Sequence, residues 1–315
     1  MTAAPTQSLR FPLGSRLRTA AGDIKLAHSV FAMPFAVFAA FLARAPGSPW
    51  PRFAGQLALV VVCMVCARTW AMMVNRLTDR RFDAANPRTA RRAVASGRLS
   101  VRDASLFTAA AAAAFVAACA LFFVLFKNPW PLALSLPVLA WIALYSFTKR
   151  FTLLCHVFLG GALGASPVAA ALAVNPAALA DLHGRGAVIL LLAGMVVLWV
   201  AGFDVIYALQ DVDFDRATGL HSIPSRLGPR AAIWISRVFH AGAFALLVVA
   251  AVPGFDPRLG WIFGAGVMLV GGLLIVEHVV LARRGKAGLE MAFFTVNGVV
   301  SCLLGLTGVV DLLLN

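Results

Sequence analysis

Long apolar runs, separated by short polar segments, alternate along almost the whole chain. A helix needs about 20 apolar residues to cross the hydrocarbon layer of a membrane, and nine runs come close to that length or exceed it. Proline and glycine gather in the gaps, as in "APGSPWPR" and "KNPWP", which is typical of loops. The nine predicted helices cover approximately residues 26–45, 53–74, 104–126, 130–148, 153–174, 186–209, 231–252, 259–282 and 289–313.

Composition supports a membrane protein. Hydrophobic residues make up 61% of the chain and charged residues 13%, whereas soluble domains are about 45–50% apolar and about 25% charged. The pattern therefore predicts an all-α membrane protein, in which residues 26–315 form one intramembrane bundle of nine transmembrane helices. Residues 1–25 are expected to form a separate N-terminal segment, without the compact apolar core of a removable signal peptide.

The net charge of +14 suggests nucleic-acid binding, but the distribution of the charge excludes it. Basic residues lie in the short loops between apolar runs, as topology signals do. With a cytoplasmic N-terminus, 20 of the 27 Lys and Arg residues fall on the cytoplasmic side and five on the other side. This bias predicts a cytoplasmic N-terminus and places the loops after the second and sixth helices on the cytoplasmic side.

Acidic residues are scarce, with 13 Asp and Glu in the chain, and two of them end the second predicted helix in "NRLTDRRFD" (75–83). Asn75, Asp79 and Asp83 are spaced four residues apart, and Arg68 lies seven residues before Asn75. If the helix continues through them, this spacing puts all four side chains on one face.

The sixth predicted helix ends in a similar pattern. Asp204, Tyr207, Asp211 and Asp215 fall on one helical stripe, whereas Asp213 points to the opposite side. The two patterns resemble a weak internal repeat, and both lie on the same predicted side of the membrane. We expect the two helix ends to form a single site at the cytoplasmic surface.

Carboxylates on two facing helices repel one another unless cations lie between them. Ligation by carboxylate and amide oxygens suits a hard cation such as Mg²⁺, which shares its coordination with substrate phosphates. Nearby arginines add bidentate contacts to phosphate oxygens. A surface ion pair is the simpler explanation for any one such motif. Two matched motifs at a membrane favour a Mg²⁺–diphosphate site, because ionisable residues in membrane segments are functional candidates by default.

The motifs resemble those of the UbiA superfamily of intramembrane prenyltransferases. The resemblance rests on N-x3-D-x3-D at 75–83 followed by "NPRTARR", on D-x2-Y-x3-D-x3-D at 204–215 followed by "RATGLHSIPSRLG", and on "YSFTKRF" at 145–151. It implies a nine-helix bundle with a central cavity open to the cytoplasmic side, where Mg²⁺ and the two motifs bind a polyprenyl diphosphate. It also implies an aromatic acceptor, which the allylic cation alkylates.

The resemblance assigns roles by position. It makes Asp79, Asp83, Asp211 and Asp215 the catalytic carboxylates and metal ligands, with Asn75 as a further metal ligand. The residues implied to bind substrate are Arg68, Asn75, Lys149, Arg150, Asp204, Tyr207 and His221. His221 departs from the family pattern, since many members have lysine at this position.

The leading hypothesis is Mg²⁺-dependent transfer of a polyprenyl group to an aromatic acceptor in respiratory quinone synthesis, at the bacterial inner membrane. The acceptor is either 4-hydroxybenzoate, for ubiquinone, or a futalosine-type intermediate, for menaquinone. A divalent-cation transporter is the non-enzymatic alternative. A CDP-alcohol phosphotransferase is the alternative enzyme, although its D-x2-D-G-x2-A-R pattern is absent from the sequence.

Two further features leave alternatives open. "LGGALGASP" (159–167) either lets two helices pack closely or leaves room for a prenyl chain, and close packing is the favoured interpretation. His28, His156 and His240 are isolated within predicted helices, so each is expected to be a packed or interfacial histidine rather than an acid or base.

Overall fold

The part of the chain that the structure describes is built from helices, without strands. The computed structural model describes residues 14, 19, 22, 31–285, 289 and 295–315. The helices are α2 (Met33–Ala43), α3 (Trp50–Thr78), α4 (Arg80–Ala85), α5 (Val101–Phe126), α6 (Trp130–Thr148), α7 (Cys155–Val174), α8 (Arg185–Tyr207), α9 (Val212–Thr218), α10 (Ile223–Leu227), α11 (Pro229–Ala250), α12 (Trp261–Arg284) and α13 (Asn297–Leu314), with the 3₁₀ helices η2 (Pro176–Ala180) and η3 (Ala208–Gln210).

Eight of the described helices are long and apolar enough to cross a membrane, namely α3, α5, α6, α7, α8 with η3, α11, α12 and α13. The all-α membrane fold predicted from the sequence is confirmed. The first predicted helix is represented by α2, which has 11 residues, and residues 23–30 before it lie outside the described residues. The count of nine spans and the cytoplasmic orientation of segment 1–25 therefore stay predictions.

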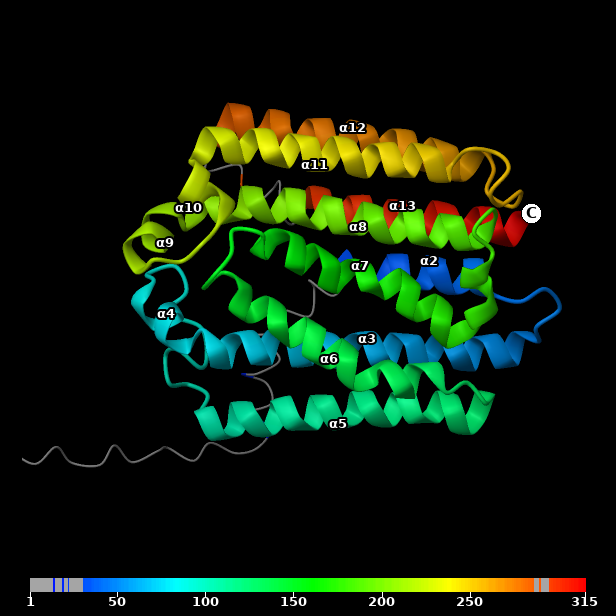
Figure 1. The fold of residues 1–315 in the computed structure, drawn as a ribbon, viewed down its shortest axis with the longest axis horizontal. Coiled ribbons are helices and arrows are strands. Elements are labelled where there is room, and N and C mark those ends of the chain that lie inside the picture. The colour runs from blue at the N-terminus through cyan, green and yellow to red at the C-terminus, as the bar shows by residue number, and fades with distance from the viewer. Residues whose placement is uncertain (1–13, 15–18, 20–21, 23–30, 286–288, 290–294) are drawn as a thin grey trace, which may run out of the picture.

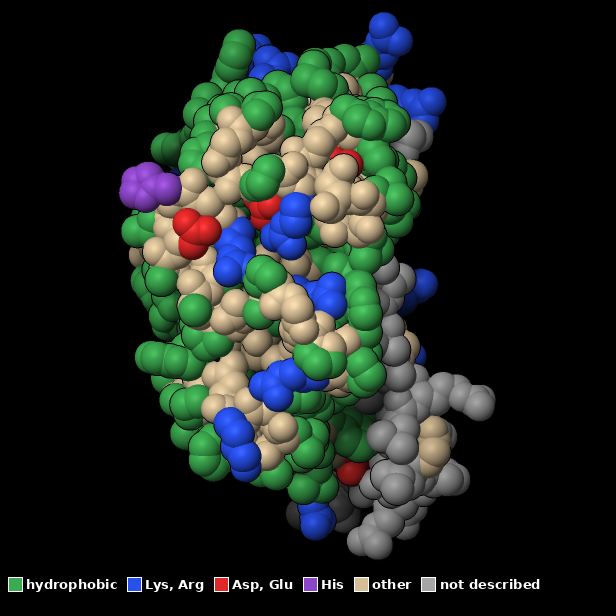
Figure 2. All heavy atoms as spheres, turned by 90° about the vertical axis from the view of Figure 1, so that its right-hand side faces the viewer, with side chains coloured by type: hydrophobic (Ala, Val, Ile, Leu, Met, Phe, Trp, Pro, Cys, Tyr) green, Lys and Arg blue, Asp and Glu red, His purple; other side chains and the backbone are tan. Residues whose placement is uncertain are grey.

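The long helices run side by side, and the short helices α4, α9 and α10 gather at one end of the bundle (Figure 1). α8 packs against both α7 and α11, while α3 packs against α5 and α6. Figure 2 looks onto the opposite end, where scattered Lys and Arg side chains and few acidic ones lie among apolar side chains. Because α4 and α9 carry the second carboxylates of the two motifs, both motifs lie at the same end of the bundle.

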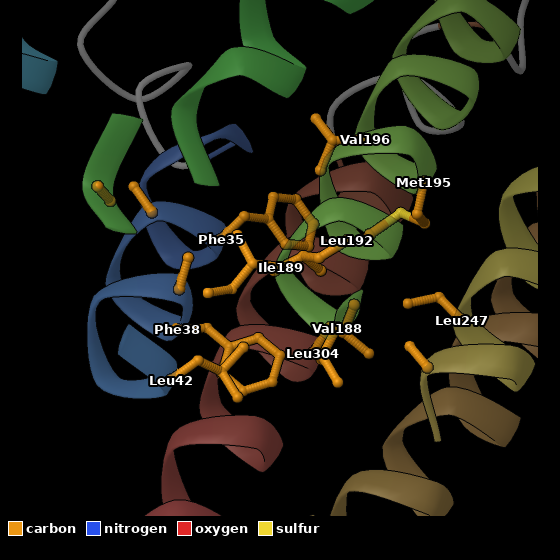
Figure 3. Close-up of a cluster of buried hydrophobic side chains, with 14 of the residues drawn as sticks. Phe35, Phe38, Leu42, Val188, Ile189, Leu192, Met195, Val196, Leu247 and Leu304 are labelled. Carbon is orange, nitrogen blue, oxygen red and sulfur yellow. The ribbon is translucent and has the colours of Figure 1, made fainter. Parts of the chain in front are cut away.

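The largest apolar core surrounds α8. Phe35 of α2 points toward Leu192 of α8, and Phe38 of α2 lies beside Leu304 of α13 (Figure 3); all four side chains are buried. Trp199 makes an edge contact with Phe35 at 5.4 Å between ring centroids, a geometry that aromatic pairs prefer. Its indole N–H donates to Asn297 Oδ1 of α13 at 2.7 Å, which avoids the cost of an unpaired buried donor. Packing and hydrogen bonding thus fix α8, the helix that leads to the second acidic motif.

α7 and α8 lie very close together because glycines face the contact. A Cβ atom at Gly160 would lie 2.2 Å from the carbonyl oxygen of Val197, and one at Gly164 would lie 2.5 Å from a methyl carbon of Val197. Small residues four apart allow two helix backbones to approach in this way. Leu159 and Leu163 of the same helix line an apolar cavity. The favoured interpretation of "LGGALGASP" as a close packing surface is thus confirmed, and room for a prenyl chain stays a prediction.

Candidate active site

A break in the helix positions each acidic motif. α3 ends one residue before Asp79, whose φ and ψ are −93° and 2°, and α4 begins directly after it. α8 passes into η3 and ends at Asp211, which has φ −107° and ψ 6° and precedes α9. Neither helix is continuous through its motif, since each breaks at the first carboxylate of its D-x3-D pair. Both residues adopt the sparsely populated bridge conformation that active-site residues often have.

The two motifs line one polar cavity of about 180 Å³. The predicted site residues in its lining are Asn75, Asp79, Asp83, Lys149, Asp204, Tyr207, Asp211 and Asp215. Asp213 is exposed and does not belong to this lining among the residues described. The side chains that share a helical face in the sequence thus meet around one space, despite the two breaks.

Residues that follow the first motif bond directly to the second motif. Asn86 Nδ2 donates to Asp211 Oδ1 at 3.0 Å, and Arg88 Nε donates to the same oxygen at 2.9 Å. Arg88 Nη2 pairs with Asp211 Oδ2, and Nη1 donates to the hydroxyl of Tyr207 at 3.0 Å. Burial disfavours the Arg88 cation, but its interactions with Asp211 outweigh burial and raise the pKa of Arg88. This arginine therefore joins the two halves of the cavity.

The carboxylates of the first motif are also paired with cations. Asp79 is only 1% exposed, with Lys149 Nζ at 2.5 Å from its Oδ2 and Arg150 Nη2 at 3.2 Å from its Oδ1. Asn75 Nδ2 donates to Asp79 Oδ2 at 3.1 Å. Arg92 Nη1 lies 2.7 Å from Asp83 Oδ1. The other oxygen of Asp83, Oδ2, is buried and has no hydrogen-bond partner among the described residues.

Asp215 has a hydroxyl partner. Ser222 Oγ donates to Asp215 Oδ2 at 2.8 Å. Burial raises the pKa of the Asp215 carboxyl, the Ser222 hydrogen bond opposes this, and the charge of Asp211 raises it further, so the pKa lies above the ordinary value. Ser222 is also the N-cap of α10, where its hydroxyl accepts from the backbone N–H of Ser225 at 3.3 Å. The start of α10 thus supports the second motif.

A buried histidine reaches the cavity from the beginning of α7. His156 Nδ1 lies 2.7 Å from Asp204 Oδ2, and the backbone N–H of Ile223 donates to His156 Nε2 at 3.2 Å. The backbone N–H of His221 donates to the carbonyl of Lys149 at 2.6 Å. The segment between α9 and α10 is therefore fastened to the end of α6 and to the start of α7.

An apolar cavity of about 460 Å³ adjoins the polar one, lined by residues of α3, α5, α6 and α7. Tyr145 and Leu159 line both cavities. Arg68 lines the apolar cavity, and its Nε is buried without a hydrogen-bond partner in the described part of the chain. Phe115 and Phe122 contribute to the mostly apolar remainder of the lining. The pair of cavities offers a charged compartment joined to a hydrocarbon-like one.

Residues 32–299 match the sequence profile of the UbiA prenyltransferase family, which is most of the chain. The chain belongs to the UbiA prenyltransferase family. Relatives of this UbiA-family protein include the 4-hydroxybenzoate octaprenyltransferases of Salmonella paratyphi B and Salmonella newport. Each is 30% identical over 255 residues, covering 79% of this chain and 82% of the relative. The predicted family is thus confirmed, and the chain is a prenyltransferase rather than a cation transporter or a CDP-alcohol phosphotransferase.

Solved structures give the same fold. The apo structure of a UbiA homolog from Aeropyrum pernix K1 is 33% identical, with a TM-score of 0.77 over 91% of this chain and 98% of that chain. A UbiA homolog from Archaeoglobus fulgidus bound to GPP and Mg²⁺ has 16% identity and a TM-score of 0.67, covering 93% of this chain and 99% of that chain. Because the identity is only 16%, the similarity to the Archaeoglobus fulgidus homolog shows a shared fold and nothing more.

Three predicted site residues of the UbiA-family protein lie elsewhere than on the polar cavity, as the described residues define it. Arg68 lines the apolar cavity, and Arg150 contacts Asp79 from outside the polar lining. The imidazole of His221 faces Arg226, with Nε2 at 2.7 Å from Nη2, so its contact with the Lys149 segment is made by its backbone.

Sequence reasoning missed several polar residues of the cavity. Asn86, Arg88 and Arg92 belong to "NPRTARR" and its flank, directly after the first motif, and this proximity was the available signal. Ser222 and His156 carry no comparable signal, because they reach the site only through tertiary contacts. The other two isolated histidines, His28 and His240, are not among the described residues that line the polar cavity. His240 is buried against Gly202, consistent with a packed histidine, and His28 lies outside the described residues.

The donors around the polar cavity fit Mg²⁺. They are carboxylates from both motifs and the amide of Asn75, and the unpaired buried oxygen of Asp83 is free to accept a cation. No group of three His, Cys, Asp or Glu side chains forms a complete metal cage within the described residues. Such a cage is unnecessary, since Mg²⁺ is commonly held by one or two carboxylates together with waters and substrate phosphates.

Proposed function

We propose that this protein transfers a polyprenyl group from a polyprenyl diphosphate to 4-hydroxybenzoate, in a Mg²⁺-dependent step of respiratory quinone synthesis. The observation that carries the proposal is the junction of the two cavities. A polar cavity with carboxylates from both motifs adjoins an apolar cavity, and Tyr145 and Leu159 line both. A prenyl diphosphate has the same two parts, an anionic head and a hydrocarbon tail.

The polar cavity would bind the diphosphate head. Asp79, Asp83, Asp211 and Asp215, with Asn75, would hold Mg²⁺. Bound Mg²⁺ supplies positive charge that stabilises the departing diphosphate. The four cations Arg88, Arg92, Lys149 and Arg150 contact these carboxylates and can turn to phosphate oxygens, with the arginines offering bidentate contacts.

The apolar cavity would bind the prenyl tail and exclude water from the allylic cation. In the reaction, the bond between C1 of the prenyl group and the diphosphate oxygen breaks, with both electrons going to oxygen. C1 then bonds to a ring carbon of the acceptor, which loses its proton to an anionic oxygen of the polar cavity. The ring face of Tyr207 already faces the Arg88 cation at 5.2 Å and can stabilise the allylic cation in the same way.

The names of the relatives support 4-hydroxybenzoate as the acceptor, with a futalosine-type intermediate as the alternative acceptor. Arg68 is suited to an anionic group of the acceptor or the diphosphate, because its guanidinium lies beside the junction residue Tyr145 on the apolar side. We place the protein in a bacterial inner membrane, with the N-terminus and the opening of the cavity on the cytoplasmic side.

The test is a product assay with purified protein in lipid nanodiscs. Geranyl diphosphate, Mg²⁺ and each acceptor are supplied separately, and products are identified by mass. We expect a prenylated 4-hydroxybenzoate, and no product after chelation of Mg²⁺. Product with only the futalosine-type acceptor would overturn the choice of acceptor. Absence of product with every acceptor, from protein that is folded and binds prenyl diphosphate, would overturn the proposed function.

Asp79→Asn tests the first motif, because it keeps the size of the side chain and removes the charge that faces Lys149 and Arg150. We expect this variant to lose turnover. An Asp79→Asn protein that prenylates 4-hydroxybenzoate at the wild-type rate would remove the first motif from the proposed mechanism.

A further inference from the structure

Buried His156 and half-buried Asp204 form a pair to which neither metal motif assigns a role. His156 is 2% exposed, and its Nδ1 lies 2.7 Å from Asp204 Oδ2. Asp204 lines the polar cavity from α8, two turns before the D-x3-D pair that ends in Asp215. The pair therefore places a histidine beside a carboxylate in the lining of the polar cavity.

The hydrogen bonds fix the proton of this histidine. The backbone N–H of Ile223 donates to His156 Nε2 at 3.2 Å, so Nε2 must carry the lone pair. The proton then lies on Nδ1 and is donated to Asp204 Oδ2, as expected when the partner of one ring nitrogen decides the state of the other. Both ring nitrogens are thus engaged, Nδ1 with Asp204 and Nε2 with the backbone of Ile223.

Asp204 differs in this respect from the carboxylates of the first motif and from Asp211. Those carboxylates each face a lysine or arginine, whereas the partner of Asp204 is a histidine. Its second oxygen, Oδ1, receives no hydrogen bond from the residues that the structure describes. A half-buried carboxylate with an open oxygen favours a hydrogen-bond donor, because charge-assisted hydrogen bonds are roughly twice as strong as neutral ones.

We propose that His156 is a positioning residue that holds the carboxylate of Asp204 in a fixed orientation, so that Asp204 accepts a hydrogen bond from the hydroxyl of the aromatic acceptor. This inference rests on the proposed function and adds the residues that recognise the acceptor. The same imidazole accepts from Ile223, so it also ties the acceptor side of the cavity to the segment that supports Asp215 through Ser222.

Two substitutions of His156 distinguish a role in positioning Asp204 from a role in proton transfer. His156→Leu removes both hydrogen bonds of the imidazole. His156→Gln can keep both, since its NH2 group can donate to Asp204 and its carbonyl oxygen can accept from Ile223, but it cannot take up a proton. Steady-state kinetics are measured with 4-hydroxybenzoate and geranyl diphosphate varied in turn.

We expect His156→Leu to raise KM for the aromatic acceptor by about tenfold to a hundredfold, the range for losing a hydrogen bond to a charged group. KM for geranyl diphosphate should stay within about threefold of the wild type, because the diphosphate partners are untouched. His156→Gln should restore both constants to within about threefold. If His156→Leu does not fold, Asp204→Asn is expected to show the same split between the two KM values.

Equal KM values for the acceptor in His156→Leu and wild type would overturn the inference. So would a folded His156→Gln protein as impaired as His156→Leu, since that result would point to proton transfer by the imidazole. An Asp204→Asn protein whose two KM values rise together would overturn it as well. These results presuppose wild-type turnover, so they are distinct from the complete lack of product that would overturn the proposed function.

Discussion

The close contact between α7 and α8 predicts how far the two helices must separate when a glycine at the contact is replaced. In Gly160→Ala the new Cβ would lie 2.2 Å from the carbonyl oxygen of Val197, whereas ordinary contact begins at 3.4 Å. Backbone must therefore retreat by about 1.2 Å, the difference between these distances. His156 lies one helical turn before Gly160, so the same shift would draw its Nδ1 away from Asp204, which is now at 2.7 Å.

Two effects should follow from this retreat. Overpacking of a tight contact costs about 1–3 kcal/mol of stability. A displacement of about 1 Å within an active site can reduce turnover by about a hundredfold, because the reacting groups lose their alignment. We therefore expect Gly160→Ala to unfold more readily in a denaturant titration and to show turnover lowered by about tenfold to a hundredfold.

Gly272→Ala is the matched control. Gly272 lies in the middle of α12 and is exposed. A Cβ atom added at this position would have no neighbouring atom within 4 Å. Alanine favours a helix over glycine by roughly 0.5–1 kcal/mol, so this variant should be as stable as the wild type or slightly more stable, with unchanged turnover. If Gly160→Ala and Gly272→Ala behaved alike in both measurements, the close α7–α8 contact would not position the site and the reasoning would be refuted.

Three further predictions concern the cavities. Asp215→Asn should lower turnover by about 10²–10³-fold, the range for losing one group that stabilises developing charge. Asp213→Asn changes an exposed side chain, so its turnover should stay within about twofold of the wild type. Equal initial rates for the two variants would contradict this prediction. Ser222→Ala removes the hydrogen bond that opposes the raised pKa of Asp215, so the pKa rises further and the ionised form is lost at a higher pH during acidification. The acid limb of kcat/KM at low Mg²⁺ should then move to higher pH, and Ser225→Ala, which alters the same helix cap, should leave the limb in place. Cys119→Phe fills part of the apolar cavity and should shorten the longest prenyl diphosphate used, read from product masses, without slowing geranyl transfer.

Much of the fold could be predicted because membrane spans are decided by length and hydrophobicity. The expected helix at 130–148 is α6 with the same bounds, and the expected helix at 153–174 is α7 from Cys155. The sharing of one cavity by the two acidic motifs also follows from helical periodicity together with the basic residues of the loops.

The rest depends on contacts between distant parts of the chain. The breaks at Asp79 and Asp211 occur where each helix leaves the bundle, and no proline or glycine marks either position in the sequence. His156 had to be judged alone, because its partners Asp204 and Ile223 are 48 and 67 residues away. Arg88 similarly joins Asp211 across 123 residues of sequence. Local pattern can name such residues as polar, but only the folded chain decides which of them meet.

The pairing of Asp79 with Lys149 and Arg150, and of Asp211 with Arg88, has a consequence for the order in which substrate components are taken up. A divalent ion that bound alone would take the aspartates from the lysine and arginines and leave these cations without anionic partners. A diphosphate that bound alone would leave the aspartates without cationic partners. When both arrive together, every existing pair is exchanged for a new one, and little net charge enters a low-dielectric space. The pocket is thus built to discriminate against either component alone, and each should bind more tightly once the other is present.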